Sequence, residues 1–316
     1  MTKNKDVDLR SLYQRYEKKE IKHIQGDHPD RILKLVQDYE EFLQEILQGT
    51  RDSVMVGSDL QSCAMYSAGA YEIFTVLEVP NPMIQIVKAA RYAVGCVCVR
   101  ETRAENGEDA AMSLSMVAEF FGYIAVADRR KDMGLFFEVL VAGLQTSLLE
   151  FFRNPLRVGQ YTDPQFSFLL LLASAFFKQP IERAGLGFTS PEWMPAYTEA
   201  LAEWRSTDLG RIRAIIDAMA DFHVQNTTRS LSSFVRAPYE NQEIFPYEIL
   251  TFLRFREWAG LENPTDFDHP LMHSPVAVLP KAPLPNPDMP LLISSLERFR
   301  TEYPEPDYCG RLLSLW

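Results

Sequence analysis

The segment from Met83 to Arg103 constrains the fold more than any other part of the chain, because it would be apolar on almost every side of a helix. A helix of that kind lies at the centre of a protein and is surrounded by other helices. Lys88 and Arg91 interrupt the apolar run, which argues against a membrane span. The segment therefore predicts the central helix of a soluble globular protein.

Amphipathic segments surround this central one. Asp30–Leu47 places its apolar residues at the i, i+3, i+4 spacing of a packed helix, and Gly49 follows at the usual C-terminal position. Further helices are predicted at Ser58 or Asp59 to Glu78, Ala110–Ala127, Met133–Phe152, Pro164–Lys178, Pro191–Trp204, from Asp208 onward, and Tyr247–Ala259. No segment alternates apolar and polar residues as a strand would, so the sequence predicts an all-α fold, a bundle of about ten helices.

The C-terminal part has a different character. Six prolines fall between Pro275 and Pro290, which excludes a continuous helix and predicts an extended segment lying over the others. A short last helix is expected near Leu291–Arg300. We therefore expect a helical domain over residues 1–260, with residues 261–316 forming a Pro-rich wrap and a short terminal helix packed on the same domain.

The net charge and the cysteines indicate the kind of partner and the cellular compartment. A net charge of −11 repels phosphate backbones, so nucleic-acid binding is not expected, and it favours a basic partner. The charged N-terminus lacks the apolar core of a signal peptide, and no membrane association is expected. The four cysteines (Cys63, Cys96, Cys98 and Cys309) suit buried free thiols in a reducing compartment. These features predict a cytoplasmic protein.

The polar motifs give little support for catalysis. His269 and His273 are four residues apart, but Pro270 between them argues against a helical metal site. His223 has no carboxylate at i−3 or i−4 on its own helix. We therefore predict no catalytic residue, no metal and no cofactor. The alternative left open is an all-α hydrolase, possibly metal-dependent, that acts on a small molecule and brings His223, His269, His273 and Asp266 together in space.

The C-terminal third resembles a known family. It contains IDAMADFHVQNTTRS, then a polar loop, then IFPYEILTFLRFREWAGLENP, and it ends in VAVLP. This arrangement is similar to the C-terminal part of the immunity protein 49 family, bacterial proteins that neutralise polymorphic toxins. The matching features are His223, the loop Phe234–Pro246, the helix Tyr247–Ala259 and Gly260.

The resemblance implies a binding protein that occludes a cognate toxin and has no enzymatic activity of its own. Residues 237–270 contain seven acidic residues and two arginines, a net charge of −5, and such a surface suits a basic toxin. Aromatic residues beside the acids can act as anchors. The expected partner-binding residues are Tyr239, Glu240, Glu243, Phe245, Glu262, Asp266 and Asp268. The sequence leaves the oligomeric state open.

Overall fold

The structure, a computed structural model, describes residues 29–149, 164–181, 195–228, 244–282 and 284–316, and four single positions near the N-terminus (14, 18, 21 and 22). These residues form eleven α-helices and two 3-10 helices and contain no strand. The predicted all-α class is therefore confirmed. None of the described helices is both long enough and apolar enough to cross a membrane.

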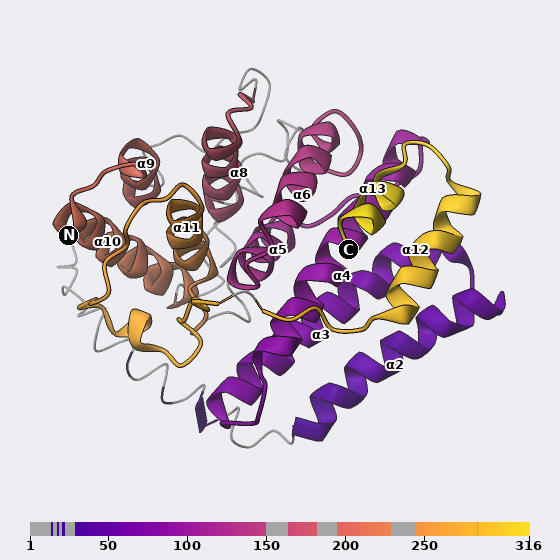
Figure 1. Cartoon of the computed structure of the whole chain (residues 1–316), viewed down its shortest axis with the longest axis horizontal. Helices are drawn as coiled ribbons and strands as arrows, with labels where there is room; N and C mark the ends of the chain where they lie inside the picture. The colour runs from indigo at the N-terminus through magenta and orange to yellow at the C-terminus, as the bar shows by residue number, and fades with distance from the viewer. Residues whose placement is uncertain are drawn as a thin grey trace, which may run out of the picture.

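Helix α4 (Met83–Glu105) lies at the centre of one side of the molecule, as its apolar sequence predicts (Figure 1). Every residue from Ala89 to Val99 is buried. The helix packs against α3, α5 and α6 and against the C-terminal helices α12 and α13. An all-round apolar surface is stable only when neighbours cover it on all sides, and five helices do so here.

Helices α2 (Pro29–Gln48) and α3 (Val56–Val76) form an antiparallel pair beside α4. Gly49 follows α2 with a φ of 74°, which confirms the predicted C-terminal glycine. The prediction that Ser58 or Asp59 caps α3 is wrong. The helix begins at Val56, and Asp59 is buried in its first turn, where it accepts two hydrogen bonds from Arg51 at 2.9 and 3.0 Å.

Helices α5 (Leu114–Val126) and α6 (Arg130–Gly143) are shorter than their apolar sequences indicate. Residues 110–113 are non-helical, and the Met112 N–H donates to the Leu148 carbonyl at 2.9 Å. Helix α6 ends at Gly143 because the chain folds back there. A Cβ at Gly143 would lie 2.6 Å from Leu148 Cδ2 and 3.2 Å from Leu148 Cβ, so any larger residue there would force Leu148 to move.

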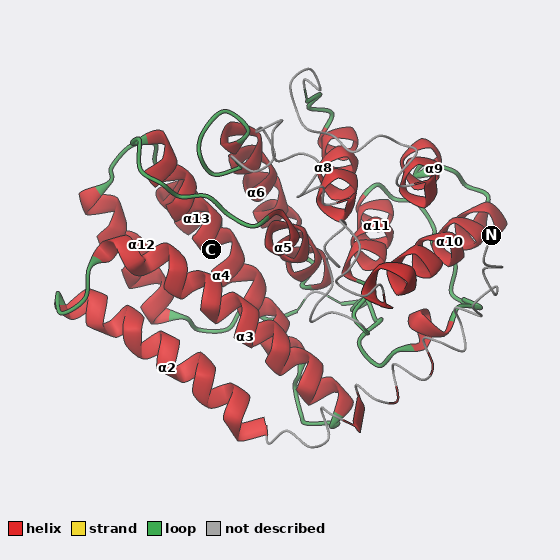
Figure 2. Ribbon diagram, turned by 180° about the vertical axis from the view of Figure 1, so that it is seen from behind, coloured by secondary structure: helices red, strands yellow, loops and turns green. Residues whose placement is uncertain are grey.

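Four helices form the other side of the molecule: α8 (Pro164–Phe177), α9 (Pro195–Glu203), α10 (Leu209–Thr228) and α11 (Tyr247–Trp258) (Figures 1 and 2). Helix α11 packs against α5, and Gly122 of α5 lies so close to Tyr247 that an added Cβ would be 2.5 Å from the tyrosine Cβ. Gly260, with a φ of 77°, follows α11 as predicted. The two sides therefore meet where α5 contacts α8 and α11 and where α6 contacts α8.

The chain then returns across the molecule. After the 3-10 helix η3 (Pro270–His273), the described residues between Pro275 and Met289 are non-helical, which confirms the extended segment. Its carbonyls are held by two arginines: Arg254 donates to Pro280 at 3.0 Å, and Arg129 donates to Leu284 at 2.8 Å. This strap, Pro275–Pro290, thereby connects η3 to the C-terminal helices.

Two helices follow the strap where only one was predicted. Helix α12 (Pro290–Glu302) corresponds to the predicted segment, and α13 (Tyr308–Leu315) was missed. The Asp307 carboxylate caps α13 by accepting the Gly310 N–H at 2.8 Å. Helix α12 packs on α2 and α4, and α13 packs on α4 and α6, so the end of the chain covers its first third.

Candidate functional site

A buried histidine connects α10 to α11. His223 Nδ1 lies 2.9 Å from Glu248 Oε1, and the Tyr197 hydroxyl donates to the same oxygen at 3.4 Å. All three side chains are fully buried. A carboxylate in this position orients the imidazole ring and fixes its tautomer. Sequence reasoning missed the pair because Glu248 lies on another helix, inside the apolar run IFPYEIL.

His269 has a separate partner on α10. Its Nδ1 accepts the Leu271 N–H at 3.1 Å and thereby caps η3. The proton must then be on Nε2, which lies 3.3 Å from Asp221 Oδ1. His269 therefore attaches η3 to α10 and fixes the chain that precedes it.

His273, the last residue of η3, stabilises the turn that precedes this helix. Its Nε2 lies 2.7 Å from the Phe267 carbonyl and donates to it. Asp266, the fourth member of the alternative enzyme site, pairs with Arg213 at 2.5 Å. His223, His269, His273 and Asp266 thus have four different protein partners. In the part of the chain that the structure describes, no group of three or more His, Cys, Asp or Glu residues could hold a metal ion.

The segment Glu262–Asp268 presents three acidic side chains to solvent. Glu262, Asp266 and Asp268 are all exposed, and Phe267 between them is half-buried. The backbone is anchored from α11, because buried Arg256 donates to the Glu262 carbonyl at 2.7 Å and to Asn263 Oδ1 at 2.9 Å. Arg213 also donates to the Asp266 carbonyl at 3.1 Å. We call Glu262–Asp268 the acidic segment.

The structure divides the predicted partner-binding residues into three groups. Glu262, Asp266 and Asp268 lie together on the acidic segment. Tyr239, Glu240 and Glu243 lie outside the described residues. Phe245 requires a correction, because it is fully buried and its ring lies 5.9 Å from that of Tyr71. It is a core residue that precedes α11 and cannot contact a partner at the surface.

Fewer charges of residues 237–270 reach the surface than the sequence count of this region implies. Glu248, Arg254 and Arg256 are buried, so three of the charges counted between residues 237 and 270 do not reach the surface. From Glu257 to Asp268 the chain has four acidic residues and no lysine or arginine. Glu257 pairs with Arg254 at 2.6 Å. Among the described residues between 244 and 270, the other exposed acidic side chains are those of the acidic segment.

The cysteines do not form a reactive site. All four are free and buried, as predicted. Burial raises the pKa of Cys96 to about 11 and that of Cys309 to about 12, and it raises the pKa of Cys63 and Cys98 as well. Thiols with such pKa values are protonated near neutral pH and are poor nucleophiles.

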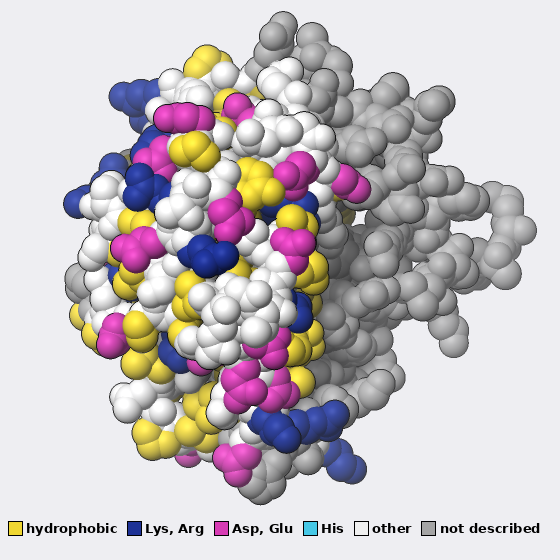
Figure 3. All heavy atoms as spheres, turned by 90° about the vertical axis from the view of Figure 1, so that its right-hand side faces the viewer, with side chains coloured by type: hydrophobic (Ala, Val, Ile, Leu, Met, Phe, Trp, Pro, Cys, Tyr) yellow, Lys and Arg dark blue, Asp and Glu magenta, His cyan; other side chains and the backbone are white. Residues whose placement is uncertain are grey.

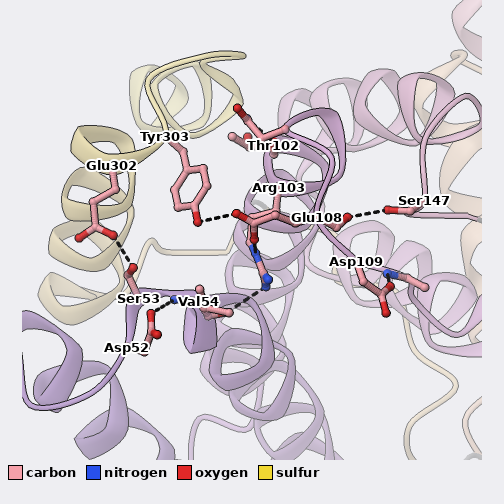
Figure 4. Close-up of polar contacts among 12 residues, drawn as sticks. Asp52, Ser53, Val54, Thr102, Arg103, Glu108, Asp109, Ser147, Glu302 and Tyr303 are labelled. Atoms are coloured by element: carbon pink, nitrogen blue, oxygen red, sulfur yellow. Dashed lines mark hydrogen bonds and ion pairs between the residues drawn. The ribbon is translucent and has the colours of Figure 1, made fainter.

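A second polar cluster joins the C-terminal end of α12 to the first third of the chain (Figure 4). Glu108 is its centre: it pairs with Arg103 at 2.6 Å, and its other oxygen accepts the Tyr303 hydroxyl at 2.8 Å. Arg103 also donates to the Val54 carbonyl at 3.0 Å. The Arg103 and Tyr303 bonds lower the pKa of Glu108. The arrangement holds α12 against the end of α4.

The face formed by α2, α12 and α13 has no single sign of charge. Figure 3 shows acidic and basic side chains interspersed with apolar ones over this face. Among its ion pairs are Arg300 with Asp307 at 2.6 Å and Arg311 with Glu138 at 2.5 Å. This mixed face therefore differs in charge from the acidic segment.

The chain matches no protein-family model, no curated protein and no solved structure. Membership of the immunity protein 49 family therefore stays a prediction, carried by the quoted residues of the C-terminal third.

Proposed function

We propose that this chain is a binding protein that neutralises a basic bacterial toxin by covering it, as the resemblance implies. The observation that supports this proposal is the acidic segment, which exposes Glu262, Asp266 and Asp268. Arg213 pairs with Asp266, and Glu262 and Asp268 make no ion pair within the described residues. Such a surface raises the rate of encounter with a basic partner and fixes the orientation of the complex.

The anchoring of the segment is the second support. Arg256, Arg213 and His273 all hold its backbone, through the carbonyls of Glu262, Asp266 and Phe267. A segment ordered before binding loses little conformational entropy when a partner docks, and more of the contact energy is available for affinity. Half-buried Phe267 lies between two exposed carboxylates and can anchor the centre of the contact.

Co-expression with the product of the adjacent gene tests the proposal. We expect the chain to restore growth of cells that produce a toxic neighbour, and to co-purify with that neighbour as a stable complex. No rescue and no complex would contradict the proposed function.

A charge-reversal pair then tests the surface. Glu262→Lys with Asp268→Lys should weaken toxin binding at least tenfold, because the two introduced ammonium groups would repel the basic partner. The matched control is Glu41→Lys with Glu297→Lys, which makes the same change in net charge at exposed positions of α2 and α12. Equal affinities for the two doubly substituted proteins would remove the acidic segment from the interface.

A further inference from the structure

An aromatic cluster lies where the C-terminal ends of α8, α9 and α11 meet the start of α6. Phe176 is its centre, with ring centroids 4.8 Å from Phe255, 4.9 Å from Phe177, 6.1 Å from Trp258 and 6.3 Å from Trp204. Phe176, Phe177 and Trp258 are only partly buried. The edge of this cluster is therefore accessible from solvent.

Positive charges cover this cluster. The Arg130 guanidinium lies 5.2 Å from the Phe176 ring centroid, and that of Arg205 lies 4.4 Å from the Trp204 ring centroid. Lys131 follows Arg130 in the chain, Lys178 follows Phe177, and all four cations are exposed. Arg130 contacts Phe176 itself, and Arg205 contacts Trp204, whose ring lies 6.3 Å from that of Phe176. The two arginines therefore lie over one apolar cluster, and the two lysines adjoin Arg130 and Phe177 in the chain.

These cations are not neutralised within the described residues. None of the four makes an ion pair there, whereas two carboxylates that bond to residues of α11 are already engaged. Asp128 accepts the Trp258 indole N–H at 2.7 Å, and Glu257 pairs with Arg254 at 2.6 Å. The surface is thus locally positive in a chain whose net charge is −11. Cations without an ion pair attract acidic groups electrostatically.

The ring contacts position the two arginine guanidinium groups to bind a carboxylate. A guanidinium stacked on an aromatic ring is held in position. One amine of Arg130 also donates to the Trp258 carbonyl at 3.2 Å, which leaves the other N–H groups of Arg130 to face a carboxylate. Tryptophan, phenylalanine and arginine beside one another are also typical of the residues that dominate protein interfaces. Both properties favour a protein partner with acidic side chains next to an apolar one.

We propose that Arg130, Lys131, Phe176, Lys178, Arg205 and Trp258, the basic aromatic surface, dock an acidic segment of a partner protein. Carboxylates of that segment pair with Arg130 and Arg205, and an apolar side chain packs between them on Phe176 and Trp258. The inference goes beyond the proposed function and does not depend on it, because this surface has the opposite charge to the acidic segment.

The geometry favours a protein over single-stranded nucleic acid. Nucleic-acid grooves of that kind stack bases on open aromatic faces. Here guanidinium groups lie over one face of Phe176 and one face of Trp204. Four cations are also too few to offset the net charge of −11, and that net charge repels a continuous phosphate backbone.

Isothermal titration of the full chain with a synthetic peptide tests the proposal. The peptide has four glutamates around a central Leu-Phe pair. We expect it to bind, with an affinity that falls as salt is added, and Arg130→Glu with Arg205→Glu should weaken binding at least tenfold. Lys131→Glu with Lys178→Glu should weaken it about threefold, since both lysines lie at the rim. Circular dichroism spectra establish that each variant is folded.

The matched control is Lys34→Glu with Lys281→Glu, which changes the net charge equally at exposed cations outside the cluster. Its affinity for the peptide should stay within twofold of the original chain. The proposal is overturned if the peptide does not bind, or if the control loses as much affinity as the arginine variant. Tighter binding of a twelve-residue thymidine oligonucleotide would assign the surface to nucleic acid instead. Concentration-dependent self-association that the arginine variant abolishes would assign it to a second copy of this chain.

Discussion

Helices α4 and α11 are both buried, but they are buried by different means. Between Ala89 and Val99, α4 contains alanine, valine, cysteine, glycine and tyrosine and a single charged residue, Arg91. Every residue of α11 from Tyr247 to Arg256 is buried as well, and three of them are charged: Glu248, Arg254 and Arg256. The position of α4 depends on shape and apolar area, whereas that of α11 depends on particular hydrogen bonds.

The difference has a physical consequence. Apolar burial is non-directional, so α4 can tolerate exchanges among similar side chains. A buried charge is stable only with its own partners, and losing one partner leaves the other unpaired in a medium of low dielectric constant. The α11 side of the molecule should therefore be more sensitive to single polar substitutions than the α4 side.

The largest effect is expected at Arg256. Its guanidinium, fully buried, donates to the carbonyls of Trp204, Ser206 and Glu262 and to Asn263 Oδ1. Arg256→Ala removes the donors of four acceptors and should cost about 4 kcal/mol of the free energy of unfolding. Urea denaturation measures this, with Arg205→Ala as an exposed control. A loss of unfolding free energy below about 1 kcal/mol would contradict the expectation that the α11 side is the more sensitive one.

Two glycine-to-alanine substitutions test how closely the same two helices, α11 and α4, are packed. Gly122→Ala places a Cβ 2.5 Å from the Tyr247 Cβ at the contact between α5 and α11 and should cost about 3 kcal/mol. Gly95→Ala on α4 places its Cβ 3.4 Å from the nearest side-chain atom, of Leu292, an ordinary contact. Its cost should stay below about 1 kcal/mol, because alanine also favours the helix. Thermal unfolding of the two variants in parallel measures the difference, and equal costs would contradict it.

The α4 side has one pH-dependent group of its own. Glu101 is fully buried, and burial raises its pKa to about 7, although the Thr146 hydroxyl that donates to it at 2.7 Å opposes this. The folded state then binds a proton that the unfolded state has lost, so the contribution of Glu101 to stability falls as pH rises from about 4.5 to about 7.

Glu101→Gln removes that titration. Relative to the original chain, the variant should gain about 2 kcal/mol of unfolding free energy between pH 5 and pH 8. Urea denaturation at the two pH values measures the gain. Glu297→Gln, at an exposed position of α12, is the control. A difference between the original chain and Glu101→Gln that does not change with pH would show that Glu101 is ionised at no cost.

The smallest effect is expected at the acidic segment. Arg213→Ala removes the ion pair with exposed Asp266, and such pairs contribute about 0.5 kcal/mol. The same variant should increase amide hydrogen exchange of residues 262–268, since Arg213 also holds the Asp266 carbonyl. Arg298→Ala, which removes a similarly exposed pair on α12, is the control. Unchanged exchange would mean that Arg256 and His273 suffice to order the segment.

Local sequence signals predict helices on both sides of the molecule, and the boundaries that depend on contacts between distant residues are the ones that the sequence misplaces. Helical periodicity and glycines such as Gly49 and Gly260 are local signals, and they locate most of the helices. The end of α6 was misplaced because the apolar run continues to Leu149, and only the approach of Leu148 to Gly143 shows where the chain turns.

The candidate site was predicted in part. The exposure of Glu262, Asp266 and Asp268 follows from a polar, Pro-containing segment without helical periodicity. The pairing of His223 with Glu248 does not, because a contact between residues 25 apart on two helices leaves no periodic signal. Phe245 was misassigned for a related reason: an aromatic residue beside a polar loop has the composition of an interface anchor whether or not the fold buries it.

The late return of the chain has a consequence during synthesis. Gly95 of α4 packs against Leu292 and Leu296 of α12, so the most apolar helix acquires part of its cover from residues translated long after it. At about 5–20 residues per second, roughly 10 to 40 s separate the synthesis of these two contact sites. During that interval one side of α4 is uncovered on the nascent chain. A ribosome-associated chaperone that protects apolar helices should therefore bind this protein from the emergence of α4 until α12 docks.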